Sequence, residues 1–358
     1  MTAKAQFEGR LAIQQRVLPG YRVAFFDTLA SRCTEGLSLY AGTPRKSESI
    51  QPADRLETAQ LWPARNLHIL GGPLYFCLQR GLMQWIQEWD PQALILEANP
   101  RYFSNRRALD WMHRKGRPVV GWGLGVGRMR NRWKSYLRRF DALIAYSSHG
   151  AEGYRSAGVP TERVFTAPNA TTGPPPELQP RTISNPPRVL FVGRLQERKR
   201  VDLLLKACRA QSMEPELWIV GDGPARAGLE RAAAKEYPET KFLGAQYGEA
   251  LADIFQEADL FVLPGTGGLA VQQAMSYGLP VIVAEADGSQ KDLVSADNGW
   301  LIPPGDLEVL TATLSEALEN VGRLPKMGTA SHRIVTERVN IEVMTEVFLE
   351  ALNQVTQT

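Results

Sequence analysis

The chain has 358 residues, of which 44% are hydrophobic and 22% charged, a composition that is typical of folded globular proteins and excludes a disordered or fibrous one. A single hydrophobic core stops growing at roughly 250 to 300 residues, so this length predicts two domains. The net charge of +3 hides an asymmetry, because residues 1–175 carry 24 Lys and Arg against 13 Asp and Glu, while the remainder carries 17 against 25.

Membrane-spanning and secreted classes are not expected. No apolar run approaches the roughly 18 residues that cross a bilayer, and the first residues lack the apolar core of a signal peptide. The expected location is the cytoplasm, with the inner face of the cell membrane as an alternative. Cys33, Cys77 and Cys208 have no metal-ligand spacing, so no metal is expected and the thiols are predicted to be structural.

In the first half, short β-branched or aliphatic runs alternate with helical periodicity, a pattern typical of parallel sheets covered by helices. The strands expected here are Leu11–Gln15, Leu37–Tyr40, Leu67–Leu70, Ala93–Leu96, Val119–Trp122, Ala142–Ala145 and Val164–Ala167.

Residues 171–187, TTGPPPELQPRTISNPP, contain six prolines and no periodicity, which excludes a helix or central strand and predicts an interdomain linker. Strands and helices alternate again after it and end in a helix over Ile341–Val355. The strands expected in this half are Val189–Val192, Leu217–Val220, Lys241–Leu243, Phe261–Leu263, Val281–Val283 and Trp300–Ile302.

The predicted fold class is therefore α/β, with two doubly wound sheets. The first domain is expected over residues 1–170, the linker over 171–187 and the second domain over 188–335. Residues 336–358 are expected to form a C-terminal helix that packs back toward the domain junction.

Ligands of open α/β sheets bind beyond the carboxyl ends of the strands. The first strand of the second domain runs into Gly193, Arg194 and, after a short loop, Lys199. Glycine lets a ligand approach the backbone, and the two cations suit a diphosphate. In isolation the same residues also fit a solvated basic loop.

Two glycine patterns do not indicate a dinucleotide cofactor. Gly221–Pro224 and Gly121–Gly127 both follow predicted strands, but neither has the GxGxxG spacing. Both are interpreted as tight turns, and no cofactor is expected.

The most informative segment is PGTGGLAVQQAMSYGLPVIVAEADG, residues 264–288, in which a strand ends in a glycine-rich turn that opens a helix. Free amides from Thr266 to Leu269 would favour an anion at the helix N-terminus, and Gln273 would reach hydroxyl groups. As a pattern alone, this also fits any strand–turn–helix unit.

Taken together, these turns resemble glycosyltransferase family 4, the group 1 glycosyltransferases, in a bacterial branch associated with surface polysaccharides. The motifs that carry the resemblance are GRLQERKR at 193–200, GDGP at 221, FLG at 242, LPGTGGLAVQQAMSYGLPVI at 263–282, NGWLIPPGD at 298–306 and, less closely, LPGYRVAFFDTLA, ILEANPRYFSNRR and AYSSHGAEGYRSAGVPTERVFTAPNA in the first half.

The resemblance implies a GT-B fold, in which two Rossmann-like domains face a cleft. It implies transfer of a sugar, with retention at the anomeric carbon, from a nucleotide sugar to a hydroxyl of a glycan or lipid-linked saccharide, an activity of hexosyltransferase type. UDP-sugars are expected over GDP-sugars. The residues implied in the reaction are Arg194 and Lys199, and those implied in donor binding are Gly193, Thr266, Gly267, Gly268, Leu269, Gln273, Glu285 and Gly20.

Three positions depart from the family pattern. The first of its two glutamates is replaced by Gly265 and the second by Gln273, and the position of its first-domain histidine is occupied by Leu124. Glu285 or Asp287 is considered as a compensating carboxylate, with a plain loop carboxylate as the alternative. His149 is a secondary polar candidate, and Gly20 fits a turn glycine as well as a donor contact.

Residues 128–140 place apolar side chains at helical spacing among five arginines and one lysine, which predicts a basic amphipathic helix. Such a helix suits peripheral contact with anionic lipid, while packing of its apolar stripe on the first sheet is the alternative. Nucleic acid is not an expected partner.

The expected function is metal-independent glycosyl transfer, because no DxD motif occurs and Arg, Lys and helix amides suit stabilisation of the leaving group. The alternative is a catalytically silent nucleotide-sugar-binding scaffold of the same fold.

Overall fold

The computed structural model describes residues 5–45, 48, 50–125, 131–175 and 177–357. The chain divides into two compact units, residues 1–171 together with 341–358, and residues 172–340. Within the described residues, no helix combines the length and apolarity needed to cross a bilayer.

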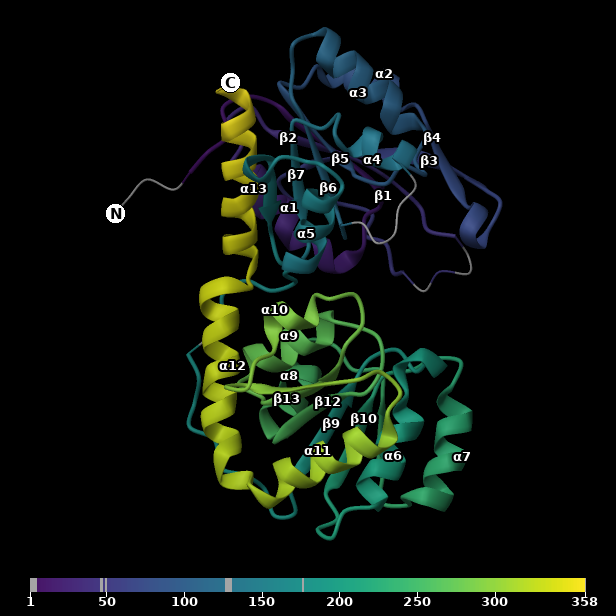
Figure 1. Cartoon of the computed structure of the whole chain (residues 1–358), viewed down its shortest axis with the longest axis vertical. Helices are drawn as coiled ribbons and strands as arrows, with labels where there is room; N and C mark the ends of the chain where they lie inside the picture. The colour runs from purple at the N-terminus through teal and green to yellow at the C-terminus, as the bar shows by residue number, and fades with distance from the viewer. Residues whose placement is uncertain (1–4, 46–47, 49, 126–130, 176, 358) are drawn as a thin grey trace. The chain divides into compact units, whose positions relative to one another are not determined.

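The first unit contains an eight-stranded sheet in the order β4-β3-β2-β1-β5-β6-β7-β8. Figure 1 labels β1 to β7 of this sheet. All neighbouring strands are parallel except β3 and β4. The strands are β1 Leu11–Val17, β2 Leu37–Gly42, β3 Gln60–Ile69, β4 Phe76–Arg80, β5 Ala93–Glu97, β6 Val119–Gly123, β7 Ala142–Ala145 and β8 Val164–Thr166.

Helices cover both faces of this sheet. They are α1 Val23–Ala30, α2 Leu82–Trp89, α3 Ser104–Arg114, α4 Asn131–Leu137, α5 Ser148–Ser156 and the C-terminal α13 Ile341–Thr356, with short 3-10 turns at Gly20–Arg22, Gly72–Leu74 and Thr161–Arg163.

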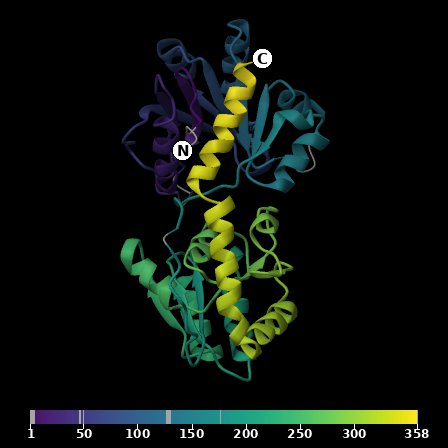
Figure 2. The same ribbon diagram turned by 90° about the vertical axis from the view of Figure 1, so that its left-hand side faces the viewer.

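The C-terminal helix α13 is part of the first unit, as Figure 2 shows. Phe348 packs edge-on against Trp122 of β6 and against Phe25 of α1, with ring centroids 4.9 Å apart in each pair. All three side chains are fully buried, and burial of each such side chain stabilises the fold by about 1.5–3 kcal/mol. The apolar spacing that predicted a final helix therefore reflects packing on this sheet.

Two details of the first sheet differ from the sequence-based expectation. Strand β3 starts at Gln60 rather than Leu67, and β4 was not predicted at all. The early part of β3 contains Pro63, which is tolerated there because β4 pairs only with residues 65–69 and leaves this stretch without an antiparallel neighbour. Strand β3 is half-exposed or exposed along its length, and β4 alternates half-exposed with buried residues, so neither presents the apolar run of a buried strand.

The second unit contains a six-stranded parallel sheet in the order β11-β10-β9-β12-β13-β14. Its strands are β9 Arg188–Val192, β10 Glu216–Val220, β11 Lys241–Gly244, β12 Leu260–Leu263, β13 Val281–Ala284 and β14 Gly299–Ile302, and its helices are α6 Val201–Arg209, α7 Arg226–Glu236, α8 Gly248–Glu257, α9 Leu269–Ser276, α10 Gln290–Leu293, α11 Leu307–Glu319 and α12 Leu324–Arg338, with 3-10 turns at Glu197–Lys199 and Val321–Arg323.

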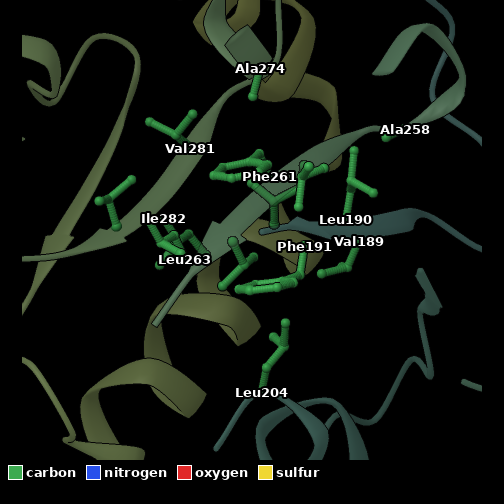
Figure 3. Packing of buried hydrophobic residues seen from close by; sticks show 14 of the residues in the cluster. Val189, Leu190, Phe191, Leu204, Ala258, Phe261, Leu263, Ala274, Val281 and Ile282 are labelled. Carbon is green, nitrogen blue, oxygen red and sulfur yellow. The ribbon is translucent and has the colours of Figure 1, made fainter. Parts of the chain in front are cut away.

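The core of the second unit sits on both faces of β9, β12 and β13 (Figure 3). Leu190 and Phe261 come from neighbouring strands, and Leu204 of α6 and Ala274 of α9 approach the sheet from opposite sides. All four side chains are fully buried. This packing fixes the sheet whose strand ends carry the candidate site.

The proline-rich segment has no helix or strand among its described residues, as the sequence predicts. It packs on the second unit, because the Arg181 guanidinium donates hydrogen bonds to the carbonyls of Phe255 at 2.9 Å and Tyr277 at 3.0 Å. These bonds tie the segment to the ends of α8 and α9.

Candidate functional site

The second sheet reverses its direction of growth between β9 and β12. The chain adds β10 and β11 on one side of β9, then returns to place β12 on the other side. Because β9 and β12 are parallel neighbours, residues 193–200 and 264–268 leave the sheet at adjacent carboxyl ends. Ligands of open α/β sheets bind at such a reversal, so the two segments that carry most of the expected site lie together.

Lys199 is the centre of this junction. Its ammonium lies against Gly267, where a Cβ atom would overlap it, and its Cε lies 3.9 Å from the position of a Cβ on Gly193. Burial, with a contribution from the neighbouring Arg198 guanidinium, lowers the pKa of Lys199 to about 8. Burial disfavours the charged form of the amine. A bound anion would favour that charged form, and its attraction to Lys199 would be screened less by water than its attraction to a solvated lysine.

Gly265 lets the two loops approach each other. A Cβ atom there would lie 2.5 Å from the carbonyl carbon of Lys199, so no side chain fits without moving the backbone. The Thr266 N–H donates to the Arg198 carbonyl at 3.0 Å, and the Arg198 guanidinium donates to the Thr266 hydroxyl at 3.0 Å. The glycine in the place of the family glutamate therefore has a structural cause in this chain.

The glycine-rich turn presents its amides at the start of α9, which has no side-chain cap. The N–H groups of Gly267, Gly268 and Leu269 donate no hydrogen bond to another described residue. The expectation of a free amide at Thr266 was wrong, because the close approach of the Arg198 carbonyl uses it. Gln273 is half-buried one turn into α9.

Arg194 follows β9 directly and is exposed. Its guanidinium forms no ion pair with any described residue. It is therefore available to a ligand at the mouth of the junction.

The carboxylates after β13 are engaged with neighbouring residues. Asp287 accepts hydrogen bonds from the Ser289 hydroxyl at 2.6 Å and from the Ser289 N–H at 3.1 Å, and so holds the turn before α10. Glu285 is exposed and pairs with Lys291 at 3.4 Å. The alternative interpretation, a plain loop carboxylate, thus accounts for Asp287. Glu285 lies at the carboxyl end of β13, the strand next to β12, and stays a candidate for donor binding.

Gln290 was not singled out from the sequence. Its side chain is 1% exposed, donates to the Gly267 carbonyl at 2.9 Å and accepts from the Ala286 N–H at 3.2 Å. It therefore fixes the glycine-rich turn to the loop after β13. Nothing in the local pattern around a glutamine identifies such a bridge, because its two partners come from different loops.

The candidates in the first unit lie at the ends of different strands. Gly20 lies after β1, and a Cβ atom there would be 3.8 Å from the Gln51 carbonyl oxygen, an ordinary contact, so packing does not demand glycine. Leu124 is 62% exposed just after β6, and His149 is exposed in the first turn of α5.

The first unit also holds a polar cluster that the sequence did not predict, at the carboxyl ends of β1 and β5. The Glu97 carboxylate accepts from the Arg16 backbone N–H at 3.2 Å, and the Tyr102 side chain tends to lower the pKa of the same carboxylate. The Arg16 guanidinium pairs with Glu48 at 2.7 Å, and Arg45 pairs with Glu48 at 2.9 Å.

The pKa values of the two acids of this cluster are shifted in opposite directions. Burial raises the pKa of Glu97 to about 7, even though Arg16 opposes the change. Burial also tends to raise the pKa of Glu48, but hydrogen bonds from Arg16 and Arg45 outweigh it and lower the pKa to about 2. A carboxyl group that titrates near neutrality at a strand end is a frequent mark of a functional site.

The basic segment 128–140 forms a shorter helix than expected. Helix α4 ends at Leu137, and residues 128–130 lie outside the described residues. Leu137 and Phe140 are buried in the core of the first unit, while Trp133 lies 5.6 Å beneath the Arg101 guanidinium. The described part of the apolar stripe therefore packs inside the unit, which was the alternative interpretation.

Comparison with known proteins finds a family match over the part of the chain that carries this site. Residues 186–320 match the family model described as "Glycosyl transferases group 1". A GDP-mannose-dependent alpha-mannosyltransferase of Mycobacterium tuberculosis is 41% identical over 190 residues, which cover 49% of this chain and 48% of that protein. A putative colanic acid biosynthesis glycosyltransferase, WcaL of Salmonella typhimurium, is 27% identical over 51% of this chain and 49% of its own length. The chain thus spans about half the length of these relatives.

Solved structures of the same architecture extend over nearly the whole chain. Anabaena HepE in complex with UDP has a TM-score of 0.73 at 16% identity and covers 96% of this chain and 99% of its own. Sucrose-phosphate synthase from Thermosynechococcus elongatus has a TM-score of 0.70 at 17% identity and covers 97% and 98%.

The fold is therefore GT-B, with one Rossmann-like sheet in each unit, parallel throughout in the second unit and parallel except for the β3–β4 pair in the first. Residues 186–320 match the group 1 glycosyltransferase family model, which confirms the resemblance that the strand-end motifs indicated.

Proposed function

We propose that this protein is a retaining glycosyltransferase that moves a sugar from a nucleoside diphosphate to a hydroxyl of a glycan or lipid-linked saccharide. The observation that carries the proposal is the half-buried Lys199 ammonium held against Gly267, at the reversal of a sheet whose sequence matches group 1 glycosyltransferases. The names of the relatives, a mannosyltransferase and a colanic acid glycosyltransferase, support sugar transfer as the reaction class.

The geometry supports a specific division of labour. Departure of the diphosphate builds negative charge on its terminal phosphate, and preorganised donors lower the barrier most when they face that charge. Arg194 and Lys199 supply two cations, and the amides of residues 267–269 supply neutral donors. We propose that this set stabilises the leaving group without a metal ion.

The proposed reaction proceeds on one face of the sugar. The bond from the anomeric carbon to the phosphate oxygen breaks, and a bond to the acceptor oxygen forms on the same side. The acceptor proton passes to the departing phosphate oxygen, so no protein nucleophile is required.

The relatives differ in the nucleotide that their names or structures contain. The Mycobacterium tuberculosis relative is named as dependent on GDP-mannose, whereas the HepE structure contains UDP. We propose that the donor is a UDP-sugar, and GDP is included in each experiment as the alternative nucleotide.

Calorimetric titration of UDP and GDP, each with magnesium or with EDTA, tests the proposal. We expect one of the nucleotides to bind equally in both buffers, and Arg194→Ala or Lys199→Ala to reduce turnover of the matching nucleotide sugar about 100-fold or more. Arg209→Ala, at the far end of α6, is the matched control. Binding of neither nucleotide would overturn the proposal, and nucleotide binding without turnover would favour the silent scaffold.

For the basic segment 128–140, we propose electrostatic rather than inserted contact with an anionic membrane. Leu137 and Phe140 are buried in the unit, while Arg138 is exposed and Lys134 is half-buried. Each basic side chain near an anionic surface contributes about 1 kcal/mol.

A further inference from the structure

Three cations of the junction have no acidic partner. Arg194, Arg198 and Lys199 form no ion pair with any described residue. The neighbouring arginines are paired, since Arg200 meets Asp202 at 3.1 Å and Arg188 meets Glu216 at 3.1 Å. Within the described residues, the lack of an acidic partner is therefore confined to the cations at positions 194, 198 and 199 of this loop.

The Arg198 guanidinium is held in place by neutral groups. Its Nη1 donates to the Thr266 hydroxyl at 3.0 Å, and its Nε donates to the Gln196 side-chain carbonyl at 2.9 Å. A guanidinium has five N–H donors in a rigid fork, so these two bonds orient the group and leave its charge uncompensated.

The loop after β12, residues 264–268, cannot supply a carboxylate from position 265. A side chain on Gly265 would run into the backbone of residues 198–199. Among the acids nearby in sequence, Glu285 pairs with Lys291 and Asp287 binds Ser289. Glu197 is exposed and makes no ion pair with Arg198.

The three cations of the junction carry one more charge than is needed to neutralise the two phosphates of the proposed ligand. A nucleoside diphosphate esterified to a sugar carries one negative charge on each phosphate, which Arg194 and Lys199 match. Arg198 then provides a third cation beside the loop that begins at Gly265. An oriented, uncompensated guanidinium is best matched by a carboxylate, which accepts two parallel N–H bonds.

We propose that Arg198 selects donors whose sugar carries a carboxylate, so that the substrate class is a nucleoside diphosphate uronic acid. This inference rests on the proposed function and narrows it. Arg198 acts as a specificity-determining residue, and the diphosphate is held by Arg194 and Lys199 in either kind of donor.

The test compares neutral and uronic donors on the same base by calorimetry. The probes are UDP-glucose with UDP-glucuronic acid, and GDP-mannose with GDP-mannuronic acid, next to UDP and GDP alone. On the base that binds, we expect the uronic donor to bind at least about tenfold more tightly than the neutral one, a difference of about 1.4 kcal/mol. Arg198→Gln is expected to remove that preference, so that the ratio of the two donor affinities falls to about one.

The matched control is Arg209→Gln, which changes an arginine of the same loop–helix unit at the end of α6. If the wild-type protein binds the free nucleotide but binds both donors equally, the inference is overturned and the proposed function stands. If it binds neither UDP nor GDP, both are overturned. The comparison within the wild-type protein decides the question even if Arg198→Gln does not fold.

Discussion

The ammonium of Lys199 lies against the backbone of Gly267, in the space that a Cβ atom on residue 267 would occupy. Gly267 also has a positive φ of 151°, a conformation that L side chains rarely adopt. Two independent constraints therefore require glycine at this position.

Gly267→Ala is predicted to displace Lys199 and strain the turn. Such backbone strain costs about 1–3 kcal/mol, so we expect a lower free energy of unfolding in urea and at least tenfold weaker nucleotide binding. Gly228→Ala is the control, since a Cβ atom on that α7 residue meets nothing within 4 Å. Equal nucleotide affinity in Gly267→Ala and the wild-type protein would contradict the proposed role of this contact.

The lowered pKa of Lys199, about 8, predicts a pH dependence of binding. An anion favours the charged amine, so nucleotide binding should take up protons near pH 8 and weaken as the pH rises above it. Calorimetry at pH 7, 8 and 9 measures this change. Lys199→Arg, whose side chain stays charged, should bind with little change over the same range.

Lys199 also affects the stability of the unliganded protein. Its pKa in the folded state lies below the ordinary lysine value of about 10.4, so the unfolded chain binds more protons between these two values. Stability should therefore rise with pH from about 8 to 10. Denaturant unfolding of Lys199→Met should lack that rise.

Gly265→Glu, which introduces the family glutamate, is predicted to reduce activity rather than restore it. Its Cβ atom would lie 2.5 Å from the carbonyl carbon of Lys199, so the loop must move away from Arg198. We expect a less stable protein and slower transfer, by kcat and by urea unfolding. Gly268→Ala is the stability control, because its nearest contact would be 3.7 Å away. Faster transfer by Gly265→Glu would show that the packing argument is wrong.

Strand ends were predictable from this sequence because buried parallel strands are continuous apolar runs that stop where a glycine or cation begins. Gly193 and Gly267 could be placed in this way. Gln290 and Glu97 could not, because their partners lie in segments distant in sequence that only the fold brings together. Strand β4 was missed because it is a short edge strand in which half-exposed and buried residues alternate, without a continuous apolar run.

The basic segment yields a prediction for vesicles of anionic phospholipid. If contact is electrostatic, co-sedimentation should fall as salt rises past about 0.15 M, where charges are screened beyond roughly 8 Å. Replacing Lys134 and Arg138 with glutamine should weaken it further. The double variant Arg209→Gln with Lys235→Gln, in the second unit, is the control. Binding that ignores both salt and the first double variant would exclude this surface.

Glu97 gives the last prediction, because its pKa of about 7 lies above the ordinary glutamate value of about 4.3. The folded protein therefore binds more protons than the unfolded chain between these two values, and the stabilising contribution is lost as the pH rises from about 4 to 7. Glu97→Gln keeps the shape and a hydrogen-bond acceptor for the Arg16 N–H but cannot ionise. Its stability relative to the wild-type protein should rise from pH 5 to pH 8, as measured by urea unfolding. Asp110→Asn, which alters an exposed acid paired with Arg139, should show no comparable change. A constant difference between Glu97→Gln and the wild-type protein would mean that Glu97 is ionised throughout this range and that the Arg16 and Tyr102 contacts outweigh its burial.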